Sequence, residues 1–292
     1  MANLKELRSR ISSVSSTMQI TSAMKLVSAA KLNKAQEAIT AMRPYADKLT
    51  ELLQNLSATL DSDSQSKFAE QREVQNVLIV AISSNRGLAG AFNSSIIKAV
   101  NNLVQQEFAG KNVSLLTLGK KANDVLKKTQ NIHKNNTDIF DRLEFDYSAE
   151  IAQEIMDAFV DEKYDKVVLV YNQFKNAATQ VVTTEQMLPI VPAEKETEEV
   201  KEGGYVLNYI FEPNKEDIIK ELIPKSLKMQ LFKALRDSFA SEHGARMTAM
   251  HKATENATEL RDSLKLQYNK ARQAAITNEI LEIVGGAEAL NS

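Results

Sequence analysis

The stretch with the clearest capacity for chemistry is a run with two glycines, SSNRGLAGAFN, at residues 83–93. It follows an apolar run that predicts a strand and precedes a predicted helix, and the backbone N–H groups of such a turn can hold a phosphate. The run lacks the third glycine of a dinucleotide fingerprint, and no Lys-Ser/Thr pair follows as in a Walker A loop. We therefore interpret it as a tight strand-to-helix turn and expect no nucleotide cofactor there.

The acidic and imidazole side chains form no recognisable catalytic or metal-binding set. His243 and His251 are eight residues apart, whereas helical metal ligands are three or four apart. The absence of cysteine excludes disulfides, thiolate zinc sites, cysteine nucleophiles and thiol switches. Four carboxylates cluster without a partner His or Ser and are typical of a solvated surface: Asp138, Asp141, Glu144 and Asp146. We expect no metal site and no catalytic residue.

The N-terminal region is basic over a long stretch. From Leu7 through Gln36 there is no acidic residue. Five basic residues lie in it: Arg8, Arg10, Lys25, Lys31 and Lys34. This pattern fits either a solvated helix face or a shaft that moves past an acidic partner surface. No aromatic side chains are interleaved for base stacking, so we expect no nucleic-acid partner.

The whole-chain composition indicates long helices and an ordinary core. The 292 residues include 43% hydrophobic residues, a net charge of −2, and only 9 Gly and 5 Pro. The length predicts about two domains, and the scarcity of helix breakers predicts long uninterrupted helices. No apolar run approaches the roughly 20 residues of a membrane span. We also expect no signal peptide, because no apolar stretch follows the charged N-terminus, and hence a location on the cytosolic side.

Residues 1–58 predict a coiled-coil helix. Its first apolar residues step by three and four, as a and d positions do: Leu4, Leu7, Ile11, Val14 and Met18. Further along we expect a stripe of small side chains that lets a partner helix approach closely: Ala23, Ala29, Ala30, Ala35 and Ala38. The many Ser and Thr residues are middling helix formers, so a partner helix must supply much of the stability.

The C-terminal region repeats this pattern. We expect a helix from Ser226 to the glycines Gly285 and Gly286, about 90 Å long at 1.5 Å per residue, which would project from the body. Its stripe should comprise Met250, Ala253, Ala257, Leu260, Leu264, Gln267, Ala271 and Ala274. If both helices leave the body near Pro44 and Pro224 and pair antiparallel, residue i faces about residue 268 − i. Leu4 would then face Leu264, Met24 would lie near Gly244, and the last residues would form an apolar tip without a helical partner.

The middle of the chain has the pattern of an α/β domain. We expect strands over residues 74–82, 113–118, 166–171, 180–188 and 205–211, and helices over 93–107, 120–128 and 148–160. Alternating strands and helices imply a largely parallel, Rossmann-like sheet. The predicted fold class is therefore α/β, with a long antiparallel coiled coil of the terminal helices. The expected domains are 1–58, 59–212 and 213–292.

Four separated motifs, in the same order, resemble the gamma subunits of ATP synthases. They are ITSAMKLVSAAK at residues 20–31, SNRGLAGAFN at 84–93, SEHGARMTAM at 241–250 and YNKARQAAITNEI at 268–280. The resemblance extends over the whole chain. It implies a rotor that is not itself catalytic: a coiled coil inside a hexamer of alpha and beta subunits, above an α/β domain that meets the epsilon subunit and the ring of membrane c subunits. One copy per complex, peripheral to the cytoplasmic side of the cell membrane, is implied as well.

The resemblance also implies positions of partner contact. Met24 and Lys25 match the N-terminal signature near the beta contact, and Arg272 and Gln273 match the pair that engages a loop of beta. Three residues match the foot that meets the c ring: Tyr205, Tyr209 and Glu212. The acidic segment 193–204 matches no signature. Two alternatives stay open on the residues alone: a nucleotide-binding enzyme with helical oligomerisation arms, and a coiled-coil scaffold that does not rotate.

Overall fold

The computed structural model describes residues 4–57, 67–190 and 215–291. The chain divides into two compact units, residues 30–245 and residues 1–29 together with 246–292. We call the first the α/β unit and the second the terminal coil. Two long helices, α1 (Leu4–Ser57) and α5 (Lys215–Asn291), contribute residues to both units.

The α/β unit contains a five-stranded sheet of order β3-β2-β1-β4-β5. Its strands are β1 (Asn76–Ile82), β2 (Asn112–Leu118), β3 (Asn131–Asn136), β4 (Lys166–Phe174) and β5 (Gln180–Leu188). Neighbouring strands are parallel except β4 and β5, which confirms the expected, largely parallel sheet. The sequence pattern missed β3, because its residues NIHKNN are polar and mostly exposed. The strand expected over 205–211 lies outside the described residues.

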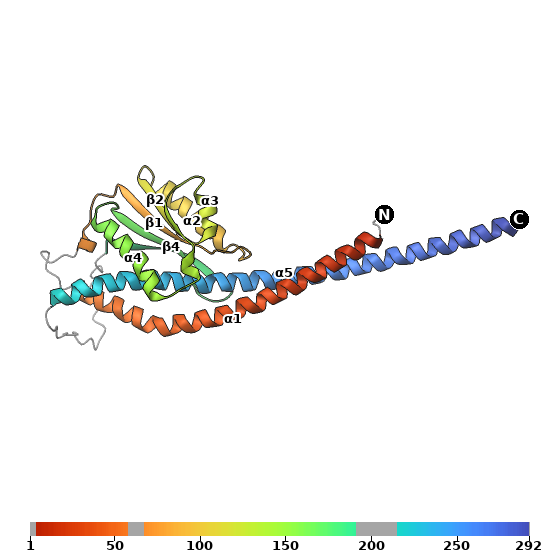
Figure 1. Ribbon diagram of the computed structural model, residues 1–292, viewed down its shortest axis with the longest axis horizontal. Coiled ribbons are helices and arrows are strands. Elements are labelled where there is room, and N and C mark those ends of the chain that lie inside the picture. The colour runs from red at the N-terminus through yellow and green to blue at the C-terminus, as the bar shows by residue number, and fades with distance from the viewer. Residues whose placement is uncertain (1–3, 58–66, 191–214, 292) are drawn as a thin grey trace, which may run out of the picture. The chain divides into compact units, whose positions relative to one another are not determined.

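Helices cover both faces of this sheet (Figure 1). Residues of α2 (Phe92–Asn102) and α3 (Lys120–Leu126) pack on one face against Val77, Ile79 and Ala81. Residues of α4 (Phe145–Val160) and the first part of α5 pack on the other face against Leu78, Val80 and Ile82. Since successive strand residues point to opposite faces, β1 must be apolar throughout, as its sequence indicated. A π-turn, η3 (Leu103–Glu107), follows α2, and two 3-10 turns, η2 (Lys67–Ala69) and η4 (Asp138–Phe140), precede β1 and α4.

The ends of the long helices differ from the prediction. Pro44 and Pro224 both lie inside helices, and α5 begins at Lys215 rather than Ser226. It also continues through Gly285 and Gly286 to Asn291, so the expected stop at the glycines is wrong. Each interior glycine costs only about 1 kcal/mol relative to alanine, and the surrounding Ile, Leu, Ala and Glu residues favour the helix.

Hydroxyl side chains, rather than alanines, continue the buried stripe of α1 in the terminal coil. Leu7, Thr21 and Ser28 are buried at multiples of seven residues, whereas Ala23 is exposed. The expected small-residue stripe is therefore wrong at Ala23 and, in the α/β unit, at Ala30. Burial of the hydroxyls is inexpensive because each donates to a carbonyl of its own helix: Thr21 Oγ1 to Met18 O at 3.1 Å and Ser28 Oγ to Met24 O at 2.8 Å.

The stripe of α5 in the terminal coil is half as predicted. Met250, Ala257 and Leu264 are buried at intervals of seven residues, as expected. The positions between them are filled by Thr254 and Arg261, which are half-buried, and the expected Leu260 is 51% exposed. The expected Ala253 and Ala271 are half-buried, whereas Gln267 and Ala274 are exposed. At Leu260 the sequence pattern was wrong by one residue, because it favoured an apolar side chain over the arginine that follows.

The two helices of the terminal coil are antiparallel, but their register differs from the prediction. Three contacts fix it: Thr254 Oγ1 to Thr21 Oγ1 at 2.8 Å, Lys25 Nζ to His251 Nδ1 at 3.3 Å, and Arg261 Nη1 to Met18 Sδ at 3.3 Å. Thr21 thus faces Thr254 instead of residue 247, a shift of about two turns. The assumption that failed is that the prolines mark the ends of the helices.

Engineered cysteines can check this register, since the chain has none of its own. A disulfide needs Cα atoms about 4.4–6.8 Å apart, and the hydroxyls of Thr21 and Thr254 are in contact. We expect the T21C/T254C variant to oxidise efficiently, as seen by a mobility shift in non-reducing gels. The control T21C/M247C, placed at the register first predicted, should stay reduced. Preferential bridging of the control pair would contradict the observed register.

Candidate functional site

The glycine-bearing turn at 83–93 caps a neighbouring helix. The first three N–H groups of α3 all have partners from residues 83–85: Lys120 N donates to Asn85 Oδ1 at 3.1 Å, Lys121 N to Ser84 O at 3.0 Å and Ala122 N to Ser83 Oγ at 3.0 Å. A phosphate held by this turn would instead need the N-terminal N–H groups of α2 (Phe92–Asn102), the helix that the turn opens. The turn therefore has a structural role, the capping of α3, that the sequence did not reveal.

The same turn is fixed internally by side-chain hydrogen bonds. Ser84 N donates to Asn93 Oδ1 at 3.0 Å, and Ser84 Oγ donates to Arg86 O at 2.6 Å. Asn85 Nδ2 reaches across to Thr137 O at 2.7 Å. The turn holds Leu88 at φ 62° with 64% of its surface exposed. The polar residues of the motif therefore define a rigid loop.

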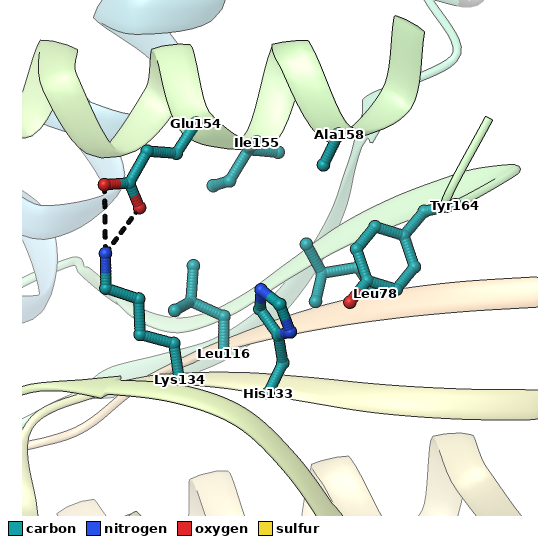
Figure 2. A pocket seen from close by; sticks show the side chains of 8 residues that line it. All are labelled: Leu78, Leu116, His133, Lys134, Glu154, Ile155, Ala158 and Tyr164. Carbon is teal, nitrogen blue, oxygen red and sulfur yellow. Dashed lines mark hydrogen bonds and ion pairs between the residues drawn. The ribbon is translucent and has the colours of Figure 1, made fainter. Parts of the chain in front are cut away.

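A small pocket lies between β3 and α4 (Figure 2). It has an empty volume of about 260 Å³, open to solvent in part. Lys134 and Glu154 close one side with an ion pair of 2.6 Å, and the rings of His133 and Tyr164 meet edge to face at 6.0 Å. The remaining lining is apolar: Leu78, Leu116, Ile155 and Ala158. No nucleophile and base are hydrogen-bonded to one another among these lining residues, so the pocket does not offer the geometry of a catalytic site.

Titratable clusters elsewhere do not suggest a metal centre. Within residues 4–57, 67–190 and 215–291, no group of three or more His, Cys, Asp or Glu side chains is placed to hold a metal ion. His251 does approach a carboxylate, with Nε2 3.5 Å from Glu255 Oε1, but its other ring nitrogen faces Lys25. Nor does any helix in the described part of the chain have an apolar stretch long enough to cross a bilayer.

Lys25, one of the expected partner contacts, is directed into the coil. It is half-buried at a seam position, seven residues after Met18, and its Nζ lies 3.3 Å from His251 Nδ1. An ammonium group can only donate, so Nδ1 is the acceptor in this contact, and the other ring nitrogen, Nε2, lies toward Glu255. Met24 is also half-buried. The ammonium group of Lys25 therefore links the two helices of the terminal coil. The sequence pattern did not indicate this contact.

Arg272 and Gln273 lie where no described residue of α1 runs beside α5. Every residue from 272 to 287 is exposed, and the apolar ones are exposed by 48–66%: Ile276, Ile280, Leu281, Ile283 and Val284. This confirms the expectation of an apolar tip that no described residue of α1 covers. Such a surface is unusual unless a partner covers it. Tyr205, Tyr209 and Glu212, with the acidic segment 193–204, lie outside the described residues.

One exposed apolar group on α1 was not anticipated. Ile20, Leu26 and Val27 are 57–68% exposed and lie off the heptad stripe that forms the seam. The sequence could have predicted this exposed apolar group, because apolar residues outside the a and d positions of a coiled coil do not enter its core. The terminal coil thus has apolar surface on both helices that is available to a partner.

Comparisons with known proteins agree on one family. The chain matches the ATP synthase family over residues 3–290. It is 72% identical to the ATP synthase gamma chain of Christiangramia forsetii over 100% of both chains, and 67% identical to that of Flavobacterium psychrophilum over 99% of both.

Solved structures agree with this match. The Tetrahymena thermophila mitochondrial ATP synthase, in a structure of its central stalk and c ring, has a chain with 26% identity and a TM-score of 0.60. That match covers 80% of this chain and 99% of the other. A chain of the Euglena gracilis mitochondrial ATP synthase has a TM-score of 0.67 at 20% identity, covering 98% and 94%, and so shares the fold. On the family match and on identity over the full length, the chain belongs to the family of ATP synthase gamma chains.

Proposed function

We propose that this chain is the central-stalk rotor of an F-type ATP synthase. Ion flow turns the c ring, the chain turns with it, and its asymmetric coil drives the catalytic beta subunits through their different nucleotide affinities. The observation that carries the proposal is the tip at 272–287, where sixteen consecutive exposed residues include five large apolar side chains. An apolar tip of this kind needs an apolar sleeve, and a hexamer of alpha and beta subunits would supply one.

The proposed partners are the alpha and beta subunits, the epsilon subunit and the c ring, with one copy of this chain per complex. The chain itself is non-catalytic, binds no cofactor and is peripheral to the membrane on its cytoplasmic side. Arg272 and Gln273 face beta at some rotor angles, and Met24 and Lys25 lie near the beta contact. The foot toward epsilon and the c ring comprises Tyr205, Tyr209 and Glu212.

A direct test is to watch the chain turn. Lys128 is exposed on the α/β unit, and the chain has no other thiol once Lys128→Cys is made. With beta immobilised and a bead on this cysteine, ATP should drive stepwise rotation. Hydrolysis with a stationary bead would favour the scaffold alternative. Nucleotide binding or hydrolysis by the isolated chain, free of beta, would favour the enzyme alternative.

Replacement of Arg272 should weaken coupling. Its guanidinium is exposed in the free chain, and in the complex we expect it to make a charge-assisted contact with a beta loop. Loss of such a partner at a buried interface costs about 2–5 kcal/mol. Membrane vesicles with Arg272→Ala should therefore pump fewer ions per ATP hydrolysed, whereas Lys270→Ala, two residues away, should pump normally. Full coupling in the Arg272 variant would contradict this assignment.

A further inference from the structure

In the α/β unit, the carboxylate of Glu185 joins three elements. Its Oε1 accepts from Gln230 Nε2 of α5 at 2.6 Å, and its Oε2 accepts from the hydroxyl of Tyr171 on β4 at 2.9 Å. Gln230 Nε2 also lies 3.2 Å from the carbonyl of Gln186. Tyr171 is only 2% exposed, so its bond to the carboxylate is shielded from water. Both oxygens of Glu185 are therefore engaged, one toward the sheet and one toward the helix.

Two further contacts fasten the same stretch of α5. Arg236 Nη2 donates to Leu143 O, just before α4, at 2.8 Å. At Gly244 a Cβ atom would be 3.2 Å from Ala177 O, in the turn that joins β4 to β5. Residues 230–244 of α5, about 21 Å of helix, are thus held near both ends and in the middle. A side chain at Gly244 would therefore require the turn at Ala177 to shift by a few tenths of an ångström.

Apolar packing and directional hydrogen bonds both hold this stretch of α5 against the sheet. Leu227, Leu231 and Leu235 of α5 are buried in the same core as the sheet. Apolar burial is non-directional, so it resists separation of the helix from the sheet more than it resists sliding. Charge-assisted hydrogen bonds are short and directional, and they oppose sliding. The bonds of Glu185 therefore add resistance to sliding to the apolar packing of the leucines.

We propose that Glu185 is a positioning residue of a load-bearing junction between β5 and α5. This inference rests on the proposed rotor function. In sequence, β5 ends at Leu188 and α5 begins at Lys215, so force applied to the segment between them enters both elements. Glu185 lies close to the end of β5, and its partner Gln230 lies in α5 beyond the first residues of that helix. It keeps strand and helix in register, so that torque reaches α5 without local slip.

The test measures coupling in the intact complex. In inverted membrane vesicles, Glu185→Ala should leave ATP hydrolysis per assembled complex and the KM for ATP near wild type. Ion pumping per ATP hydrolysed, read with a potential-sensitive dye, should fall at least about three-fold. Thr184→Ala, on an exposed neighbour in β5, is the matched control and should pump normally. Glu185→Gln keeps an acceptor for Tyr171 and should restore most of the coupling. A merely structural role would lower hydrolysis and pumping together.

A second experiment uses a cross-link, and it tests the proposal even if Glu185→Ala assembles poorly. Because this chain has no cysteine of its own, the only pair within it that a short bifunctional thiol reagent can join is that of E185C/Q230C, and the single variants E185C and Q230C control for bridges to other subunits. Pumping per ATP should be low before cross-linking and recover after it. Normal coupling in Glu185→Ala, or no recovery on cross-linking, would overturn the junction. Absence of coupled pumping with the wild-type chain would instead overturn the proposed function.

Discussion

Gly119→Ala should destabilise the α/β unit by at least about 3 kcal/mol. Gly119 follows β2 with φ 109°, where side chains are strained, and a Cβ there would lie 2.2 Å from the backbone oxygen of Ser83. Ser83 cannot move freely, because its N–H donates to Leu118 O at 2.8 Å and its Oγ accepts from Ala122 N at 3.0 Å. The substitution would therefore disturb β1, β2 and the cap of α3 together.

Gly110→Ala is the matched control for this prediction. Gly110 also has a positive φ, 78°, but no atom lies within 4 Å of a Cβ built there. Only the backbone strain applies, so the cost should be about 1 kcal/mol. Urea unfolding of both variants, followed by circular dichroism, measures the difference. Equal midpoints for the two variants would show that the close approach to Ser83 does not matter.

Alkaline solution should destabilise the wild-type chain through Tyr171. Burial of the phenol, and then the charge and hydrogen bond of Glu185, raise the pKa of Tyr171 far above its ordinary value, with Asp237 adding to the effect. In the unfolded chain the phenol ionises near pH 10, whereas the folded chain keeps the proton. Above about pH 10 the folded state therefore binds more protons, and the free energy of unfolding falls by about 1.4 kcal/mol per pH unit from this group.

Tyr171→Phe isolates that contribution. Other groups titrate in the same range, but they are common to both proteins, so the difference between the two unfolding free energies reports Tyr171. Below pH 10 the variant should be less stable by about 1–3 kcal/mol, because Glu185 loses a buried donor. The gap should shrink as the pH rises from 10 to 11. A gap that stays constant over this range would mean that Tyr171 ionises as readily in the folded chain.

The sequence by itself determined the elements whose pattern is local. The alternation of apolar runs and helices specified four strands of the sheet, and the run Gln180–Leu188 agrees with β5 at both ends. The heptad of Leu4 to Met18 specified a coiled coil, since the positions of apolar residues along a helix already define its buried face. The exposed tip was expected from the proline register, and it survives the corrected register because α5, with 77 residues, is longer than α1, with 54. The four motifs specified the family, which no contact in the structure was needed to establish.

Only the tertiary structure decided which polar residues are inside. NIHKNN forms β3 because β2 offers it a hydrogen-bonding edge, although its side chains gain little from burial. Thr21, Ser28 and Lys25 occupy the seam because the repeat of the helix places them there, and local or cross-helix bonds satisfy them. The register of α1 against α5 was also decided there. Register depends on where both helices are anchored. The anchor points depend on packing along the whole chain, so no single stretch of sequence specifies the register.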